Sequence, residues 1–393
     1  MNLFDKRNMR MATMSRAVTL GLHVFGIWPY VPSTILFRFY WIVVFSTMQV
    51  FQYRYVIVNV HTDDFSQFMD GVSSALASSL LYIKLVILWV NQRVVFDLLQ
   101  MMTTDWQDYN SNRHNSSVLM NTTNLARRTS TWIIGMQMAS VTCYSIGVLA
   151  ANITNPARME PYARELILKM EFPFNISTES IYLTVQSVQL YHLLLIGYCV
   201  AIVNLFLVIL ILHVGGQIDI LCEWLTNAFS RHLTHLSEEI TMRTIITKHQ
   251  QIILFAENIE NLYTYIALMI LLSDTFIICC LGFIIVISLD APNAAAILVK
   301  SVLFYITVNV EAFIYCVAGE YLSAKSKMIG HAAYHSVWYD YPTTESRIIV
   351  FVILRSQRTL TITSGKVMDL SLERFTSVIK ASVSYLSVLL AMY

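Results

Sequence analysis

Apolar residues form long runs along most of the chain, and shorter polar segments separate these runs. A helix needs about 20 apolar residues to cross the hydrocarbon core of a bilayer. Seven runs have the length or nearly the length required, although the last is shorter and rich in serine. They cover residues 33–58, 72–92, 131–151, 183–213, 264–289, 297–320 and 374–392. This pattern predicts an all-α, polytopic membrane protein with seven transmembrane helices.

The connecting segments differ greatly in length. Residues 214–263 and 321–373 combine helical apolar spacing with mixed charges, and the first of these segments continues into the fifth span without a helix-breaking residue. We therefore expect helices 4 to 6 to extend beyond the membrane into a packed cytoplasmic bundle, the anchor bundle. The chain divides into 1–320, which holds transmembrane helices 1–6 and their loops, and 321–393, which holds an anchor helix and helix 7.

Basic residues are distributed unequally between the two sets of loops. Seventeen lysines and arginines precede span 1 or lie between spans 2 and 3, 4 and 5, or 6 and 7, whereas only Arg158, Arg164 and Lys169 occupy the alternate loops. Cytoplasmic loops carry the excess of Lys and Arg in membrane proteins. The distribution predicts a cytoplasmic N-terminus and an extracellular C-terminus.

Composition supports the membrane assignment and excludes other classes. Hydrophobic residues make up 56% of the chain and charged residues 13%, against about 25% charged residues in soluble proteins. Lys plus Arg number 26 against 25 Asp plus Glu, so there is no basic excess for nucleic-acid binding. The scattered histidines and cysteines form no metal-ligand spacing, and no catalytic motif is visible. We expect a lipid bilayer as the surroundings, and no enzyme activity, metal or cofactor.

Several charged residues fall within or at the edges of the spans, where they are candidates for function. These residues are Arg54, Lys84, Asp274, Lys300, Glu311, Arg374 and Lys380. Asp274 and Glu311 lie near mid-membrane on adjacent spans. They form either a hydrogen-bonded or protonated pair inside the bundle or a polar element that couples spans 5 and 6 to gating.

A candidate ligand site lies among the outer halves of spans 2, 3, 4 and 6. Aromatic and aliphatic walls with a few hydroxyl and amide groups suit a small, mostly apolar ligand. Each residue taken alone more often serves helix packing, so the assignment is by region rather than by motif. The candidates are Ser74, Ser78, Leu81, Met138, Thr142, Ser145, Tyr182, Gln186, Gln189, Phe304, Tyr305 and Val308.

Small and weakly polar residues recur on one face of the last span: Ser377, Ala381, Ser384, Val388 and Met392. Such a face allows close helix packing or lines a water-filled path at the centre of an oligomer. In the second interpretation Ser384 faces hydrated ions, and Val388 and Met392 form an apolar constriction near the outer mouth.

Asn-x-Ser/Thr sequons occur on both sides of the predicted membrane. Asn152 and Asn175 lie in the 3–4 connection, placed outside, whereas Asn115 and Asn121 lie in the 2–3 connection, placed inside. Sequons therefore do not decide the topology on their own.

The C-terminal third resembles the insect odorant receptor family. Residues 315–342 and 363–389 carry a Tyr-Cys that closes span 6, an Ala-x-Tyr, a Trp-Tyr, a Gly-Lys before span 7 and a Ser-Tyr-x-x-Val-Leu within it. Here these residues are Tyr315, Cys316, Ser326, Ala332, Tyr334, Trp338, Tyr339, Gly365, Lys366, Ser384, Tyr385, Val388 and Leu389. The N-terminal two thirds resemble the family in layout only.

The resemblance implies a ligand-gated, non-selective cation channel in the plasma membrane of olfactory sensory neurons. Such receptors are heterotetramers of tuning subunits and a shared co-receptor, which a small volatile ligand opens to monovalent and divalent cations. The position that matches the family's pore-lining valine is Val388. The chain lacks the long 4–5 loop of the co-receptor, so the resemblance implies an odorant-tuning subunit.

Two other receptor classes remain as alternatives. A seven-helix G-protein-coupled receptor would require an outside N-terminus and an Asn-Pro-x-x-Tyr motif in span 7, which contains no proline. A gustatory receptor of the same channel superfamily is closer, but the Trp-Tyr and Ser-Tyr-x-x-Val-Leu segments fit odorant receptors better.

Overall fold

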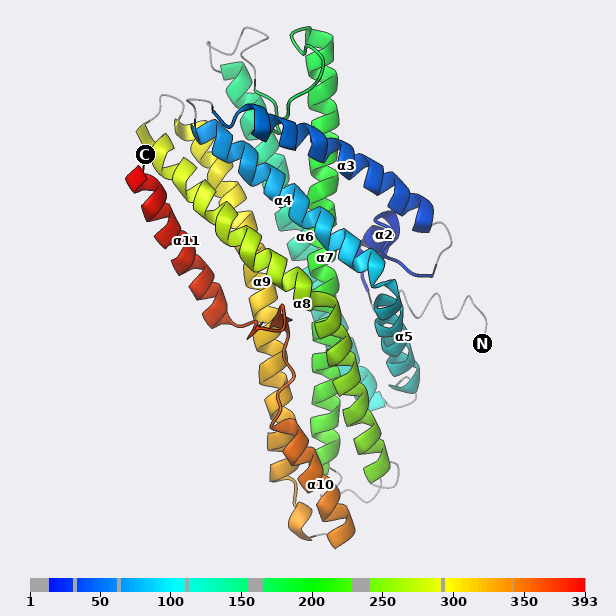
Figure 1. The fold of residues 1–393 in the computed structure, drawn as a ribbon. Helices are drawn as coiled ribbons and strands as arrows, with labels where there is room; N and C mark the ends of the chain where they lie inside the picture. The colour runs from blue at the N-terminus through cyan, green and yellow to red at the C-terminus, as the bar shows by residue number, and fades with distance from the viewer. Residues whose placement is uncertain are drawn as a thin grey trace.

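The structure, a computed structural model, is a bundle of long helices (Figure 1). It describes residues 14–30, 34–61, 65–109, 113–154, 165–227, 241–290, 294–340 and 342–392. The α-helices are α2 (Arg16–Val24), α3 (Thr34–Val58), α4 (Phe65–Val90), α5 (Gln92–Tyr109), α6 (Arg113–Thr154), α7 (Glu179–Asn227), α8 (Met242–Ile287), α9 (Ala294–His335), α10 (Thr343–Ser356) and α11 (Leu372–Met392). Two short 3-10 turns, η3 (Ser288–Asp290) and η4 (Trp338–Asp340), follow α8 and α9.

Six helices in the described part of the chain are long and apolar enough to cross a membrane: α3, α4, α6, α7, α8 and α9. They contain the first six predicted spans almost residue for residue, which confirms the all-α, polytopic prediction. The seventh predicted span falls in α11, a further helix of 21 residues that packs along α8 and α9 (Figure 1).

Helices α7, α8 and α9 are much longer than a bilayer is thick. They contain 49, 46 and 42 residues, and a helix rises about 1.5 Å per residue against a hydrocarbon core of about 30 Å. Their far ends continue together beyond the other spans and meet α10 (Figure 1). An ion pair between Lys325 and Asp219, 2.5 Å apart, joins α9 to α7 in this region. The predicted extension of helices 4 to 6 into the anchor bundle is therefore confirmed.

A buried polar cluster ties α5 to the same long helices. Asp105 of α5 contacts His213 Nε2 of α7 at 2.9 Å through Oδ2, and Lys248 Nζ of α8 donates to its Oδ1 at 2.7 Å. Burial acts to raise the pKa of Asp105, but the His213 hydrogen bond and the charges of His213 and Lys248 hold that pKa below its ordinary value. The carboxylate therefore stays ionised and links three helices.

A short hairpin leads from α10 into α11. Strands β1 (Thr363–Ser364) and β2 (Met368–Asp369) pair in antiparallel fashion around Gly365 and Lys366, both of which have positive φ. The backbone N–H groups of Gly365 and Lys366 donate to the carbonyl and hydroxyl oxygens of Thr264 on α8, at 2.9 and 3.0 Å. The hairpin, which the sequence pattern did not predict, fixes the start of α11 against α8.

Candidate functional site

A cavity of about 120 Å³ lies between α4, α6, α7, α8 and α9. Aliphatic and aromatic side chains make up most of its wall, and a few polar groups converge on it. The lining residues are Ser74, Ala77, Ser78, Leu80, Leu81 and Lys84 of α4; Gln137, Val141 and Tyr144 of α6; Leu193, Ile196, Gly197 and Val200 of α7; Asp274 and Ile277 of α8; Phe304, Thr307, Val308 and Glu311 of α9; and Leu168. Cavities with such a lining suit small, mostly apolar molecules.

Helix α4 contributes a wall of small side chains. The hydroxyl of Ser74 donates to the carbonyl of Gly71 at 3.0 Å, and that of Ser78 donates to the carbonyl of Ser74 at 3.0 Å. Serine and threonine in helices commonly bond back to the preceding turn in this way. Because their hydroxyl protons are donated within the helix, these serines offer the cavity hydrogen-bond acceptors but no free donors. Their small side chains also leave room in the cavity.

Three charged residues form one end of the cavity. Lys84 of α4 makes an ion pair with Glu311 of α9, and its side chain is 1% exposed. Asp274 of α8 is the third, and it is 1% exposed. The sequence suggested Asp274 and Glu311 as partners, whereas the structure pairs Glu311 with the lysine from span 2, because α4 packs against α8 and reaches α9.

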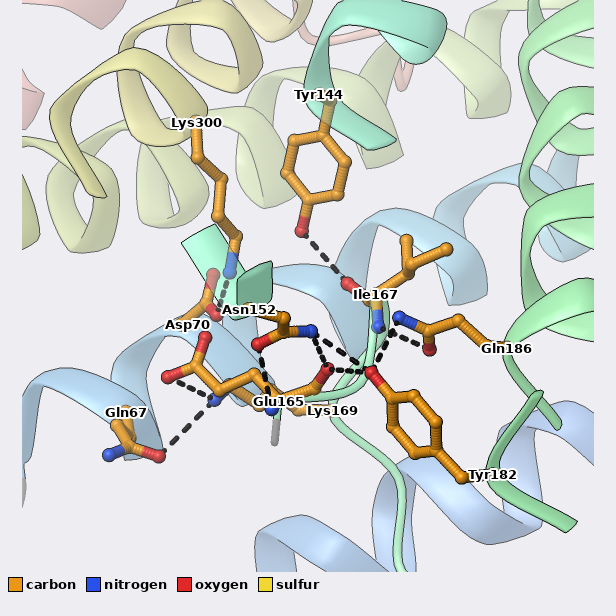
Figure 2. A network of polar contacts seen from close by, with 10 residues as sticks. All are labelled: Gln67, Asp70, Tyr144, Asn152, Glu165, Ile167, Lys169, Tyr182, Gln186 and Lys300. Carbon is orange, nitrogen blue, oxygen red and sulfur yellow. Dashed lines mark hydrogen bonds and ion pairs between the residues drawn. The ribbon is translucent and has the colours of Figure 1, made fainter. Parts of the chain in front are cut away.

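The opposite end of the cavity is covered by the segment 165–171, the cover segment, which connects the region after α6 to α7 and contributes Leu168. Its described residues are not helical, yet Leu166, Ile167, Leu168 and Met170 are buried. The Tyr144 hydroxyl donates to the carbonyl of Ile167 at 3.4 Å from α6 (Figure 2). Residues 161–164, which precede it in the chain, lie outside the described residues.

Side chains of α6 and α7 hold the backbone of the cover segment in place. Gln189 accepts from the N–H of Leu168 at 3.3 Å and donates to its carbonyl at 3.1 Å. Gln186 accepts from the N–H of Ile167 at 3.4 Å, and the Tyr182 hydroxyl donates to the carbonyl of Glu165 at 3.3 Å (Figure 2).

Asn152, at the end of α6, completes this attachment. Its Nδ2 donates to the Glu165 carbonyl at 2.7 Å and to the Tyr182 hydroxyl at 3.0 Å, and its Oδ1 accepts from the N–H of Glu165 at 3.1 Å. Each polar group of this amide is thus used to hold the cover segment against α6 and α7 (Figure 2).

Ionic contacts add to the attachment from the other side of the cavity. Lys169 Nζ lies 3.2 Å from Gln67 Oε1 and 3.4 Å from Glu165 Oε1, and Lys300 of α9 makes an ion pair with Asp70 of α4 (Figure 2). Burial lowers the pKa of Lys169. The cover segment is therefore tied to α4, α6 and α7 at once.

Five of the predicted site residues line the cavity: Ser74, Ser78, Leu81, Phe304 and Val308. The other seven lie nearby but do not line it. Tyr182, Gln186 and Gln189 hold the cover segment, and Thr142 is exposed while its hydroxyl donates to the Met138 carbonyl. Ser145 is buried with its hydroxyl on the Val141 carbonyl. Tyr305 packs with Phe304 in a neighbouring apolar cluster. Ligand binding by any of the twelve stays a prediction.

On α6 the predicted and the observed lining residues differ because the helix is rotated. The lining residues Gln137, Val141 and Tyr144 each precede a predicted residue by one position, which is a rotation of about 100° around the helix. Gly197 of α7 sets this rotation, because a Cβ there would lie 2.7 Å from Val141 Cγ2. The missing side chain lets Val141 pack directly on α7 and turns Thr142 outward.

On α7 the prediction chose the helix face that points at the cavity, but the residues that line the cavity lie further along the helix than the predicted ones. Gln186 and Gln189 continue at helical spacing into Leu193, Ile196 and Val200, which line the cavity. The apolar i, i+3, i+4 series in this part of α7 was a signal available in the sequence. The prediction instead used the polar residues Tyr182, Gln186 and Gln189 near the start of α7, which hydrogen-bond the backbone of the cover segment.

Helix α11 has one packed and one exposed face. Val378, Ser382 and Leu386 face α8, where the Ser382 hydroxyl donates to the Thr275 carbonyl at 3.2 Å. Ser384 is exposed and Val388 is 57% exposed on the opposite face. Met392 ends the helix, and its side chain lies outside the described residues.

Together these features define a multi-pass, all-helical membrane protein with a mostly apolar cavity among its spans. The family model for the 7tm odorant receptors matches residues 64–383. The chain is 24% identical to odorant receptor 13a of Drosophila melanogaster over 374 residues, which cover 90% of this chain and 87% of that one. It is 32% identical to odorant receptor 10 of Aedes albopictus over 149 residues, or 38% of this chain and 39% of that one.

Solved structures show the same fold. The insect olfactory receptor OR5 of Machilis hrabei in complex with eugenol superposes with a TM-score of 0.80 at 14% identity, covering 99% of this chain and 100% of that one. A second structure of OR5 from the same organism superposes with a TM-score of 0.78, covering 96% of this chain and 97% of that one. The chain belongs to the insect odorant receptor family, a family of receptors rather than enzymes. Among the three receptor classes considered, the comparisons favour the odorant receptor.

Proposed function

We propose that this odorant receptor is a tuning subunit of a ligand-gated cation channel, which a small volatile molecule opens by binding in the cavity between α4 and α6–α9. The observation that carries the proposal is the cavity itself, which is mostly apolar and is covered at one end by a tethered segment. A fold neighbour was solved in complex with eugenol. The lipid bilayer surrounds the spans, and monovalent and divalent cations are the permeating partners.

The exposed face of α11 supports a pore formed by several copies. One short helix cannot enclose a path for ions, so Ser384, Val388 and Met392 would line it only at the centre of an oligomer. Val388 is 57% exposed in the single chain, as expected for a side chain that a pore leaves open to water. An apolar ring at this level would close the path by dewetting.

We also propose that the two parts of the chain, divided at residue 320, have different roles. Residues 1–320 hold the ligand cavity, whereas 321–393 supply the end of the anchor bundle and the pore helix. Around α10 and η4 the side chains of Tyr334, Tyr339, Phe351 and Leu354 are exposed, and exposed apolar patches of this kind mark contacts between proteins. We assign this surface to contacts with the co-receptor subunits of a heterotetramer.

Helix α8 connects the cavity to the pore. Asp274 and Ile277 line the cavity, while the carbonyl of the intervening Thr275 accepts from Ser382 of α11. Further along, Leu386 of α11 lies 3.0 Å from the Cβ position at Gly282. A ligand that binds the open arrangement more tightly shifts the closed–open equilibrium, and a movement of α8 would reach α11 directly.

Orientation and location follow from the charge distribution. With the basic loops in the cytoplasm, the cover segment and the end of α11 face outside, where an airborne ligand arrives. The receptor would then act in the plasma membrane, at the dendrites of olfactory sensory neurons.

Substitutions that fill the cavity test the proposal, with an outward-facing residue as the matched control. Ser78→Leu reduces the cavity volume, so we expect the ranking of volatiles to change and the largest active ones to lose most of their potency. Thr142→Leu adds the same side chain on the exposed side of α6 and should leave the ranking unchanged. Whole-cell currents to a volatile panel, with the co-receptor present, measure both. An unchanged ranking in Ser78→Leu with normal surface expression would contradict this site.

A further inference from the structure

The charged end of the cavity holds an excess of carboxyl groups. Lys84 is engaged by Glu311, and its ammonium group also lies 5.8 Å from the centre of the Tyr315 ring. Asp274 lines the cavity beside this pair. One cation therefore faces two carboxyl groups where almost no water reaches them.

Asp274 is left without a hydrogen bond on one side. Within the described part of the chain no group bonds its Oδ2, which is buried. A buried acceptor without a partner costs free energy, and a buried carboxylate costs more. Because Asp274 lines the cavity, a molecule bound there can supply the missing donor.

The protein's own hydroxyl protons around the cavity are already in use. Ser74, Ser78 and Thr307 each donate to a carbonyl one turn earlier in their helices, the last to Leu303 at 2.9 Å. Tyr144 donates to the cover segment. The hydroxyl groups of these walls therefore offer no free donor to a ligand, whereas Asp274 offers an acceptor to one that donates.

We propose that Asp274 is a specificity-determining residue whose unpaired carboxyl oxygen accepts a hydrogen bond from the ligand, so that the cavity takes a small, mostly apolar molecule with one O–H or N–H donor. The class comprises alcohols, phenols and amines. This proposal rests on the proposed function in one respect, because it places the ligand in the same cavity. Ethers and hydrocarbons of equal size would leave Asp274 unpaired and bind less tightly, because a site built to pair a polar group discriminates against ligands that lack it.

The test uses the purified full-length receptor in detergent and measures ligand affinity from the shift of its thermal unfolding. The probes are hexyl, benzyl and cyclohexylmethyl skeletons, each as the hydrocarbon, methyl ether, alcohol and primary amine, with the matching aldehyde as an acceptor-only probe. We expect the alcohol or amine of a skeleton to bind at least about tenfold more tightly than its ether and aldehyde. Aldehydes or ethers that bind as well as their alcohols and amines would overturn the proposal.

Two variants distinguish the contribution of Asp274 to ligand binding from that of the rest of the cavity. They also distinguish the preference for alcohols from the preference for amines. Asp274→Leu should abolish the preference for donors without weakening hydrocarbon binding. Asp274→Asn keeps an acceptor oxygen but no charge, so the alcohol preference should persist and the amine preference should fall. Thr142→Val, on the outward face of α6, should change neither. An unaltered donor preference in Asp274→Leu would overturn the role of Asp274.

The outcomes also distinguish this proposal from the proposed function. Donor-selective binding without any ligand-evoked current would contradict the channel and leave the ligand class standing. Binding and current without donor selectivity would contradict only the ligand class. No thermal shift with any probe would overturn both the ligand class and the cavity as the binding site.

Discussion

Lys84 shows how much a single side chain can change the interpretation of a membrane span. In the sequence it is one of several charges within or at the edges of the spans. Only the packing of α4 in the folded bundle, chiefly against α8, places it beside Glu311 of α9. Sequence spacing along one helix cannot indicate a partner 227 positions away. The presence of buried charges was predictable, because their positions in apolar runs are plain, but their pairing was not.

Breaking this ion pair should destabilise the receptor strongly. Lys84→Met leaves two buried carboxyl groups without a cation, and removal of one partner of a buried pair typically costs about 3–5 kcal/mol. Glu311→Gln should cost less, because Asp274 remains to balance Lys84. The double variant should be more stable than the sum of the single effects predicts. Unfolding temperatures in detergent measure all three, and strictly additive losses would contradict the pairing.

The two outer sequons should differ in glycosylation. A glycan attaches to the amide nitrogen of asparagine; that of Asn152 is buried and donates to Glu165 and Tyr182. Asn175 is exposed, and its Oδ1 only accepts from the Ser177 N–H at 2.9 Å. We expect a peptide glycosidase to increase the gel mobility of the wild type, and Asn175→Gln to abolish that change. Thr154→Ala, which removes the Asn152 sequon, should preserve it; the reverse pattern would contradict the buried role of Asn152.

At the scale of elements, the helices were predictable and their rotations were not. Apolar runs locate the membrane-spanning parts of α3, α4 and α6–α9, because the bilayer demands continuous apolar helices. Rotation depends on contacts between helices, such as Val141 against Gly197. The hairpin before α11 depends on positive φ at Gly365 and Lys366 and on Thr264, which lies 101 positions before Gly365. No local pattern specifies that contact.

The Asp105 cluster gives the junction of α5, α7 and α8 a defined dependence on pH. Its lowered folded-state pKa means that the contribution to stability is fully present above the ordinary carboxyl pKa, about 3.9, and is lost as the pH falls through the lower folded value. Asp105→Asn should therefore lower the free energy of unfolding by about 1–3 kcal/mol at neutral pH.

The same difference should begin to shrink as the pH falls through about 4, where Asp105 becomes protonated in the unfolded state, and should vanish below the lower folded-state pKa, where it is protonated in both states. His213 and Lys248 face this carboxylate directly. Asp108 lies on the same helix as Asp105, and its titration affects the wild type and the variant alike because both proteins carry it. Unfolding temperatures of wild type and variant across this range provide the measurement. A difference that is constant with pH would show that Asp105 acts through packing rather than charge.

At the scale of the whole molecule, the chain has a cavity among its spans, an anchor bundle and an exposed face on α11, and α8 contacts all three regions. The sequence predicted this arrangement from apolar runs, charge distribution and the C-terminal resemblance. It did not predict that the polar residues of α7 would hold the cover segment rather than line the cavity, because a glutamine in a span suits either role. The partner of a buried amide depends on where a distant loop folds back.

The most direct test of the account is the current through Val388→Cys when a pore-directed thiol reagent is applied. The receptor is expressed with an odorant co-receptor and opened by a volatile ligand, and Val383→Cys, also 57% exposed on α11, serves as the control. We expect the reagent to reduce the current of Val388→Cys in the presence of ligand and to leave Val383→Cys unaffected. A current that persists unchanged in Val388→Cys, with labelling of the cysteine confirmed, would contradict a pore lined by α11.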